Sequence, residues 1–362
     1  MTDAPAFRAQ FPVLESCSYL NAGTEGPVPQ AAADAVHERV DRDTAGGRAG
    51  RRYFDEVMDL ADRARAAYAS VLGTDPANVA LTGSTTDGLN TVLGGLRFSP
   101  GDDILTSDQE HPGLLAPLRR VRVLHGISIR VVPFEAIAGE VRETTKLVAC
   151  SHVSWVNGSV VDAAGLRASG VPFVLDAAQG IGAVPVDLAE LGCDYYAASG
   201  QKWLCGPEGS GCLYVRPDRL DELEPPWPGY ATLADHDNIL DSGLAEGARR
   251  LDHGFPSAVR SAWSLASIEV FAAAGWDWVH ARAATLAERL ADGLAARGLT
   301  VAPRGRSTLV SWSVADTQAE VDRLAAEEVV IRSIPIGSLL RASVGAWTSE
   351  DEVDRLVDLA AA

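Results

Sequence analysis

Short apolar runs alternate with longer amphipathic stretches along most of the chain. The apolar runs predict strands at residues 78–82, 103–107, 127–133, 147–152, 173–176, 194–198 and 212–216. The amphipathic stretches predict helices at residues 30–43, 54–72, 86–96, 113–124 and 258–273. This alternation favours an α/β fold, with a mostly parallel seven-stranded sheet that is covered by helices on both faces.

After residues 254–256 the pattern changes to a long helical stretch, with a helix predicted at residues 276–297 that stops at Gly298. Shorter strands are predicted at residues 308–313, 329–332 and 340–344. We therefore expect three units: an N-terminal arm of residues 1–20 that packs with the small domain, a large cofactor-binding domain of residues 21–255, and a small α+β domain of residues 256–362.

Composition narrows the classes of function. The chain has 362 residues and a net charge of −18, which argues against binding to nucleic acid or to anionic membranes. No apolar run is long enough to span a bilayer, and the N-terminus does not resemble a signal peptide. The five cysteines form no CxxC pair, which is typical of reduced thiols in a cytoplasm, and the seven histidines show no metal-binding spacing. We expect a cytoplasmic protein without a metal site.

Lys202 lies just after the predicted strand 194–198, in the segment Ser199-Gly200-Gln201-Lys202-Trp203. Lysines usually lie on exposed helix surfaces, whereas this one lies between small residues and an aromatic ring. Partial burial would lower the pKa of its amine and leave a nucleophile of the kind that imine chemistry requires. The alternative is a surface lysine in a loop, and spacing alone does not decide between the two.

Asp176 follows the apolar run 171–175. A carboxylate just past a buried strand is costly unless a partner compensates its charge. A protonated pyridine nitrogen is such a partner, because the carboxylate keeps the nitrogen charged and the ring can then accept electrons from a substrate. The alternative is an N-cap aspartate at a strand-to-helix turn. The presence of Lys202 at the end of a nearby strand favours the first interpretation.

The segment Leu81-Thr82-Gly83-Ser84-Thr85-Thr86-Asp87-Gly88 follows a predicted strand and opens a predicted helix. Hydroxyl and amide groups at the positive end of a helix form a seat for an anion, although hydroxyl caps are also frequent. His111 follows the predicted strand 103–107, where its imidazole could lie on a cofactor ring or simply begin a helix. The Rossmann fingerprint and the Walker phosphate loop are both missing.

These segments, in this order, resemble the class V aminotransferase superfamily of fold-type I pyridoxal 5'-phosphate (PLP) enzymes. Its members include cysteine desulfurases, cyst(e)ine C–S lyases and isopenicillin N epimerase-like proteins. The resemblance runs from Tyr19-Leu20-Asn21-Ala22-Gly23 to Leu340-Arg341-Ala342-Ser343. It implies the fold described above, PLP as the cofactor, a small-molecule amino-acid substrate, and a homodimer with its active sites at the subunit interface.

The same resemblance implies a role for each matching residue. Lys202 matches the lysine that forms the Schiff base, Asp176 the partner of the pyridine nitrogen, and His111 the histidine that stacks on the ring. The other cofactor-binding positions match Ser84, Thr85, Gln179, Ser199 and Gln201. Arg341 and Asn21 match substrate-binding positions, where a guanidinium would grip the substrate carboxylate. The alternative for Arg341 is a surface arginine on a C-terminal strand.

Two departures from the family pattern affect the cofactor site. Trp155 stands where desulfurases often have an asparagine beside the ring hydroxyl, and Asn157 is a candidate substitute. Phe255 replaces a threonine that contacts the phosphate of the neighbouring subunit, and Ser257 is a candidate substitute there. Both contacts are therefore in doubt.

A third departure bears on the reaction. Desulfurases carry a catalytic cysteine in a mobile loop, whereas residues 333–340 are a short stretch without cysteine, and Cys205 lies elsewhere and is expected to be a packed thiol. We therefore expect a C–S lyase acting on cysteine, cystine or a cysteine conjugate, with Lys202 as the base that removes the substrate α-proton. Transamination and epimerisation remain open because they share these first steps. A non-catalytic binding protein on the same fold would not require the Lys202/Asp176 pair.

Overall fold

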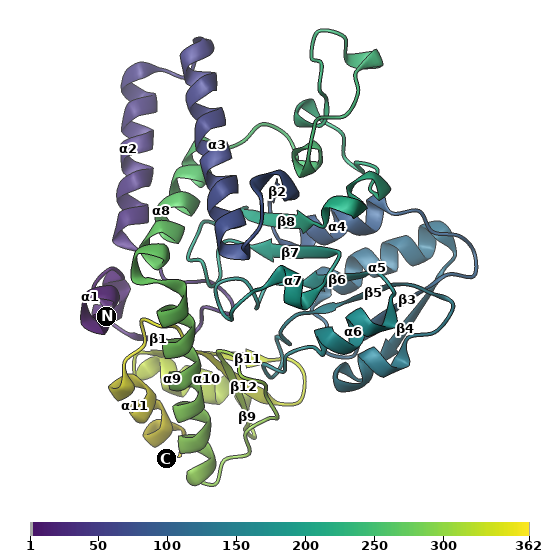
Figure 1. Cartoon of the computed structure of the whole chain (residues 1–362). Coiled ribbons are helices and arrows are strands. Elements are labelled where there is room, and N and C mark those ends of the chain that lie inside the picture. Colours follow the sequence, from purple (N-terminus) through teal and green to yellow (C-terminus); the bar gives the residue numbers. More distant parts are fainter. Residues whose placement is uncertain (1–2, 362) are drawn as a thin grey trace.

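The computed structural model describes residues 3–361 and has a large sheet at its centre (Figure 1). Its strands are β2 (Val79–Thr82), β3 (Asp103–Ser107), β4 (Ser128–Val132), β5 (Thr145–Ser151), β6 (Phe173–Asp176), β7 (Tyr195–Ser199) and β8 (Gly211–Val215). They lie in the order β2-β8-β7-β6-β5-β3-β4. Only the pairings of β8 with β2 and β7 are antiparallel, so the prediction of a mostly parallel seven-stranded sheet is confirmed.

Helices cover both faces of this sheet (Figure 1). They are α3 (Gly50–Leu72), α4 (Thr85–Gly95), α5 (Pro112–His125), α6 (Ala163–Ser169), α7 (Leu188–Leu191) and α8 (Ala258–Ala274). The helix α2 (Gln30–Gly46) packs on α8. Successive strand residues face opposite sides, so Leu175 packs with Leu72 of α3 and Ile268 of α8, while Val174 packs with Leu89 of α4 and Leu118 of α5. The result is a three-layer α/β/α arrangement with two cores.

A second, smaller sheet follows near the C-terminus. Its strands β9 (Leu309–Ser313), β11 (Arg332–Ile334) and β12 (Leu339–Ser343) are antiparallel in the order β11-β12-β9. The helices α9 (Trp276–Ala296), α10 (Thr317–Ala326) and α11 (Glu350–Ala360) accompany it. The predicted strand 329–332 is in fact two strands, because β10 (Val329–Val330) pairs with β1 (Ser18–Tyr19) and the chain changes partner at Ile331.

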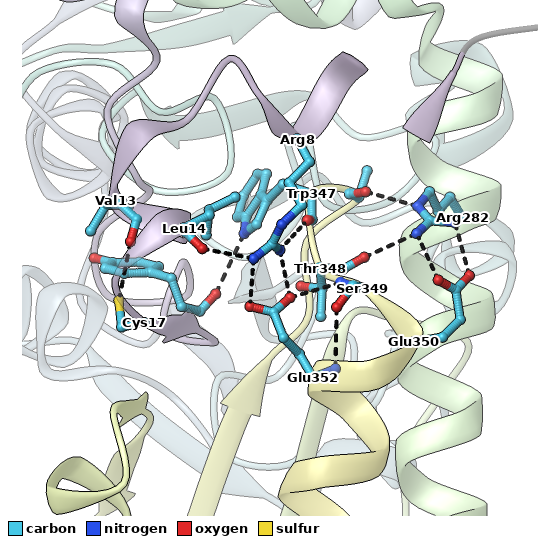
Figure 2. A network of polar contacts seen from close by, with 12 residues as sticks. Arg8, Val13, Leu14, Cys17, Arg282, Trp347, Thr348, Ser349, Glu350 and Glu352 are labelled. Carbon is cyan, nitrogen blue, oxygen red and sulfur yellow. Dashed lines mark hydrogen bonds and ion pairs between the residues drawn. The ribbon is translucent and has the colours of Figure 1, made fainter. Parts of the chain in front are cut away.

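The N-terminal segment crosses from this smaller part of the molecule to the large sheet. The helix α1 (Ala4–Arg8) is tied to α11 by Arg8, which contacts both carboxylate oxygens of Glu352 (Figure 2). After β1, Asn21 bridges to Ser343 at the end of β12. These pairings place residues 23–25 against the ends of the large sheet. The limits of the three predicted units stay a prediction. The helix α8 was assigned to the unit 256–362, but it packs against α2 and α3 of the unit 21–255.

Between β8 and α8 the chain makes a long excursion that projects from the body of the molecule (Figure 1). It holds the short 3₁₀ helices Pro217–Glu222, Tyr230–Thr232, Ile239–Asp241 and Ala248–Leu251. Large apolar side chains on it are exposed, among them Tyr230 and Leu240. Within residues 3–361, no helix is both long enough and apolar enough to cross a membrane.

Candidate active site

The ends of several parallel strands and one N-terminal segment converge on a cavity of about 250 Å³. Every predicted site residue except Asn21 lines it: Ser84, Thr85, His111, Asp176, Gln179, Ser199, Gln201, Lys202 and Arg341. The carboxyl ends of parallel strands meet at one edge of the sheet, which explains how residues so far apart in sequence come together. Roles for these residues remain proposals, whereas their convergence is an observed feature of the fold.

Lys202 follows β7, the neighbour of the strand that ends at Asp176. Its amine is largely surrounded by protein but reaches the cavity. Burial lowers the pKa of Lys202 to about 8, while the nearby Asp176 carboxylate opposes that shift. At this pKa about a tenth of the amine is uncharged at pH 7, far more than for an ordinary lysine, and this is the form that a nucleophile or a general base requires.

Asp176 is 5% exposed at the end of β6. Its Oδ1 accepts a hydrogen bond from the amide of Ala178 at 3.0 Å and so holds the turn that follows, but residues 177–187 form no helix, so the helix N-cap alternative is wrong. Burial nevertheless raises the pKa of Asp176. Among residues 3–361 it has no ion pair. A cationic ring nitrogen at this place would supply the missing charge partner.

The start of α4 and the end of β7 offer hydrogen-bond donors to an anion. Ser84 Oγ caps α4 by accepting from the amide of Asp87 at 3.1 Å, so the capping alternative is correct for this residue. The hydroxyls of Thr85 and Ser199 are buried and have no hydrogen-bond partner, and Gln201 Oε1 is likewise unpartnered. Unpaired buried hydroxyls beside a helix N-terminus fit a phosphate group, which accepts several hydrogen bonds at once.

His111 begins α5 and also faces the cavity. Its Nδ1 accepts from the amide of Gly113 at 3.0 Å, and its ring meets the edge of Trp155 with ring centroids 4.9 Å apart. Desolvation, with the positive charges of Lys202 and Arg332, lowers the pKa of His111 to about 4. The imidazole is therefore neutral near pH 7 and can stack on an aromatic cofactor. His111 thus begins a helix, as one alternative stated, and this position leaves its ring able to lie on a cofactor, as the other stated.

Gln179 and Asn157 differ in what they can offer to a ligand. Gln179 lines the cavity, but its Nε2 donates to the carbonyl of Gly23 at 2.8 Å and its Oε1 accepts from Trp203 Nε1 at 2.9 Å. Asn157 does not line the cavity, and its Oδ1 accepts from the amide of Ser159 at 2.9 Å. A position outside the cavity lining does not favour Asn157 as the substitute for the missing asparagine, and the suggestion stays a prediction.

Arg341 is fully buried on β12, contrary to the surface alternative. Its Nη1 donates to the carbonyl of Trp155 at 2.7 Å, while Nε and Nη2 have no partner. These two groups form one edge of the guanidinium, which suits bidentate binding of a carboxylate. Burial lowers the pKa of Arg341 to about 9, and the neighbouring Arg332 adds to that shift.

Asn21 does not line the cavity. Its Oδ1 accepts from Thr24 Oγ1 at 2.9 Å, and Arg332 Nη1 donates to the same threonine oxygen at 3.2 Å. The expected contact of Asn21 with the substrate stays a prediction, because Asn21 is not among the residues that line the cavity. Thr24, Glu25 and Arg332 line the cavity but were not predicted. The only signal for Arg332 was its place at the end of a predicted strand.

A buried acid next to the site was also missed by sequence reasoning. Glu110 accepts from Ser107 Oγ at 2.5 Å and from Ser151 Oγ at 2.6 Å. Burial raises the pKa of Glu110 to about 7, and the charge of Asp176 contributes. Ser151 is the sheet partner of Asp176, so Glu110 helps to fix the strand end that presents that aspartate.

Phe255, which replaces the phosphate-contacting threonine, and Ser257, its candidate substitute, do not line the cavity of their own chain. Phe255 is about half exposed and packs edge-to-face on Phe54, with ring centroids 5.5 Å apart. Ser257 Oγ accepts from the amide of Arg260 at the start of α8. Within residues 3–361, no three His, Cys, Asp or Glu side chains are grouped so that they could hold a metal ion.

Comparison with known proteins gives consistent matches over nearly the whole chain. The family model described as "Aminotransferase class-V" matches residues 18–356. Isopenicillin N epimerase of Streptomyces clavuligerus is 33% identical, over 94% of this chain and 93% of that protein. A probable cysteine desulfurase of Pseudomonas aeruginosa is 29% identical, over 98% of this chain and 94% of that protein.

Among solved structures, the protein C-DES is similar in two states. A variant of C-DES with glycine covalently linked to its PLP cofactor superposes with a TM-score of 0.93 at 28% identity, covering 98% of both chains. The complex of the cystine C–S lyase C-DES with its reaction product, cysteine persulfide, gives a TM-score of 0.92 at 28% identity, covering 97% of this chain and 99% of that one. These structures share the fold described above.

Proposed function

The chain belongs to the aminotransferase class-V family, and from this premise we propose that it is a C–S lyase that acts on cysteine, cystine or a cysteine conjugate. Family membership and the PLP-linked state of C-DES identify it as a PLP-dependent enzyme. When bound, PLP supplies an electron-accepting ring that stabilises negative charge on the substrate α-carbon. Elimination of the sulfur substituent then follows from loss of the α-proton.

The residues of the cavity would divide the work as follows. Thr85 and Ser199 would donate hydrogen bonds to the cofactor phosphate, and Asp176 would hold the ring nitrogen in its charged form. Arg341 would orient the substrate through its α-carboxylate. Lys202 Nζ would take the proton from the substrate α-carbon, a task that suits an amine whose pKa is about 8.

One observation carries the choice of a lyase over a desulfurase: the β11–β12 hairpin. Residues 335–338 join the two strands as a tight turn, so there is no loop here and no cysteine to receive sulfur. Cys150, Cys193, Cys205 and Cys212 are buried, and none of the five cysteines lines the cavity. Burial also raises the pKa of Cys205 well above its usual range, as expected of a packed thiol. The substrate sulfur would therefore leave as part of the thiol or persulfide product and would not be transferred to a cysteine of the enzyme.

For cystine the reaction balances with one water. The Cβ–S bond breaks, its electron pair leaves with the sulfur, and cysteine persulfide is released. The remaining three-carbon fragment takes up water and gives pyruvate and ammonia. The likeness to C-DES, whose complex holds cysteine persulfide, supports this version of the reaction. The 33% identity with isopenicillin N epimerase keeps epimerisation as the rival, and transamination is a further alternative.

The test is to incubate the PLP-loaded protein with L-cystine and with cysteine conjugates. A lyase forms pyruvate and ammonia without a second keto acid. A keto acid that appears only when another keto acid is supplied indicates transamination, and loss of optical rotation without product indicates epimerisation. Either of these outcomes would contradict the lyase proposal.

Lys202→Ala should lower kcat at least about 10³-fold, because the base is lost. The other lysine of the chain offers a matched control: Lys146 is exposed on β5, and Lys146→Ala should retain full activity. Turnover that persists in Lys202→Ala would show that another group removes the proton.

We also propose that the protein is a cytoplasmic homodimer with the cavity near the subunit interface. The family resemblance suggests this assembly, and the exposed pair of Phe54 and Phe255 is apolar surface that a second copy could cover. Light scattering coupled to gel filtration measures the mass. A mass of one chain at micromolar concentration would rule the dimer out.

A further inference from the structure

Two charged side chains at the cavity take part in no ion pair among residues 3–361. Arg332 and Glu25 both line it, and within residues 3–361 neither forms an ion pair, with each other or with any other side chain. A guanidinium or a carboxylate that is partly withdrawn from water without a partner destabilises the fold. Such groups at a binding cavity are available to a charged ligand.

Arg332 and Arg341 are direct cross-strand partners in the β11–β12 hairpin. Like charges placed opposite one another in a sheet repel, and negative charge in front of the pair would relieve that repulsion. The two guanidinium groups are not equivalent, however. Arg341 leaves its Nε–Nη2 edge free, whereas Arg332 already donates from Nη1 to Thr24 at 3.2 Å and from Nε to the carbonyl of Ser333 at 3.1 Å. Arg341 suits one bidentate carboxylate, and Arg332 is held apart to face a second.

Glu25 is fixed on the same wall by its own backbone. Its carbonyl accepts from the hydroxyl of Tyr19 at 3.0 Å, and the next amide, of Gly26, donates to the carbonyl of Gln201 at 2.7 Å. Thr24, which holds Arg332, is its neighbour in the chain. The cavity is therefore lined by one carboxylate and one guanidinium besides the predicted site residues. Burial raises the pKa of Glu25 to about 6, with Glu208 adding to the shift and Lys202 opposing it.

We propose that Glu25 and Arg332 form a second recognition site, which binds the ammonium and the carboxylate at the far end of a substrate that carries an amino-acid head at both ends. Cystine and lanthionine are substrates of this class. The inference rests on the proposed function for the reacting end, where Arg341 takes the first carboxylate. It makes Arg332 and Glu25 specificity-determining residues that do not take part in the bond cleavage.

The experiment uses four thioethers that release similar thiolates but differ at the far end. S-methylcysteine has no charge there, S-carboxymethylcysteine has a carboxylate, S-(2-aminoethyl)cysteine has an ammonium, and lanthionine has both. In the PLP-loaded wild type, kcat/KM should be lowest for S-methylcysteine and highest for lanthionine. The difference should lie mainly in KM, because the far end binds equally well before and during the reaction.

The variants separate the two contributions. Arg332→Gln should reduce the preference for S-carboxymethylcysteine over S-methylcysteine about tenfold, and Glu25→Gln should reduce the preference for S-(2-aminoethyl)cysteine by a similar factor. Arg119→Gln and Glu143→Gln, which change exposed residues outside the cavity, are the matched controls and should leave both ratios as they are. Arg332→Lys, which keeps the charge, should restore part of the carboxylate preference and guards against a variant that fails to fold.

Binding gives a second readout that does not depend on turnover. Calorimetric titration of PLP-loaded Lys202→Ala with the four compounds should show the same order of affinity. If Arg332→Gln and Glu25→Gln lowered kcat/KM equally for all four substrates, the inference would be overturned. Arg332 would then bind the same carboxylate as Arg341, and Glu25 would act through Lys202. A wild type without preference among the four would overturn it as well. Failure to cleave any of them, with ordered binding retained, would instead refute only the lyase reaction.

Discussion

Two arginines, Arg8 and Arg341, show opposite uses of the same side chain. Arg8, on the N-terminal segment, donates to Glu352 at 2.6 and 3.0 Å and to the carbonyls of Leu14 and Trp347, each at 2.9 Å (Figure 2). Arg341, in the cavity, is 0% exposed against 27% for the Arg8 side chain, yet it makes one hydrogen bond and no ion pair. The more deeply buried charge has the fewer partners.

The same contrast holds for the acids. Glu352 has Arg8 as its partner, and its carboxylate also accepts from the amide of Ser349 at 2.8 Å to cap α11. Glu25 lines the cavity, and among residues 3–361 it forms no ion pair. Charges that stabilise the fold have partners within the protein, whereas the charges that we propose to bind a ligand lack them, at a cost in stability. This difference separates a structural ion pair from a binding site without reference to any relative.

The strongest test of the comparison is Arg341→Met, a replacement of similar volume. Loss of the carboxylate grip should lower kcat/KM about 100-fold. Removal of an unpaired buried charge should at the same time raise the free energy of unfolding by about 1–2 kcal/mol. Steady-state kinetics and denaturant unfolding without substrate measure the two effects.

Arg8→Met is the matched control and should show the reverse, because it strands Glu352 without a cation. We expect a less stable protein with unchanged kcat/KM. If both variants lose stability alike, the two arginines are structural to the same degree and the comparison fails.

A smaller effect should follow from the pKa of Glu25, which burial raises to about 6. The group is charged only above that pH, so its attraction for a substrate ammonium is present above pH 6 and lost below it. The charged groups that act on it are Glu208 and Lys202. The ratio of kcat/KM for S-(2-aminoethyl)cysteine over S-methylcysteine should rise about fivefold from pH 5 to pH 7. Glu25→Gln should flatten this profile, and a rise that survives the substitution would point to another acid.

The smallest effect concerns the paired acid. Glu352→Gln should lower the free energy of unfolding by about 1 kcal/mol, because the ion pair is partly exposed, and should lower Tm by about 1–3 °C. Differential scanning calorimetry measures this shift. Glu350→Gln, which breaks the more exposed pair with Arg282, should change Tm less. A larger Tm decrease for Glu350→Gln than for Glu352→Gln would mean that burial does not determine how much these ion pairs stabilise the fold.

Much of the fold follows from patterns along the chain. The alternation of apolar and amphipathic segments predicted the large sheet. Asp176 and Lys202 were recognisable because each lies at or just after the end of a predicted strand. The helix α11 was missed although Ser349 and Glu352 form a capping box before an apolar face, a signal that was present in the sequence. The strand at 329–332 was placed correctly but not divided, because its two halves differ only in their partners.

The sequence by itself determined which residues end the strands of the large sheet, and therefore which of them reach its reactive edge. Only the tertiary structure decided that Arg332 stands opposite Arg341, that Glu25 reaches the same cavity, and that Asn21 does not. Those facts depend on strand register and on contacts between residues more than 300 positions apart, such as Arg332 with Thr24. Periodicity reports the face of an element on which a residue lies, but a charge without a partner is visible only when all its neighbours are in place.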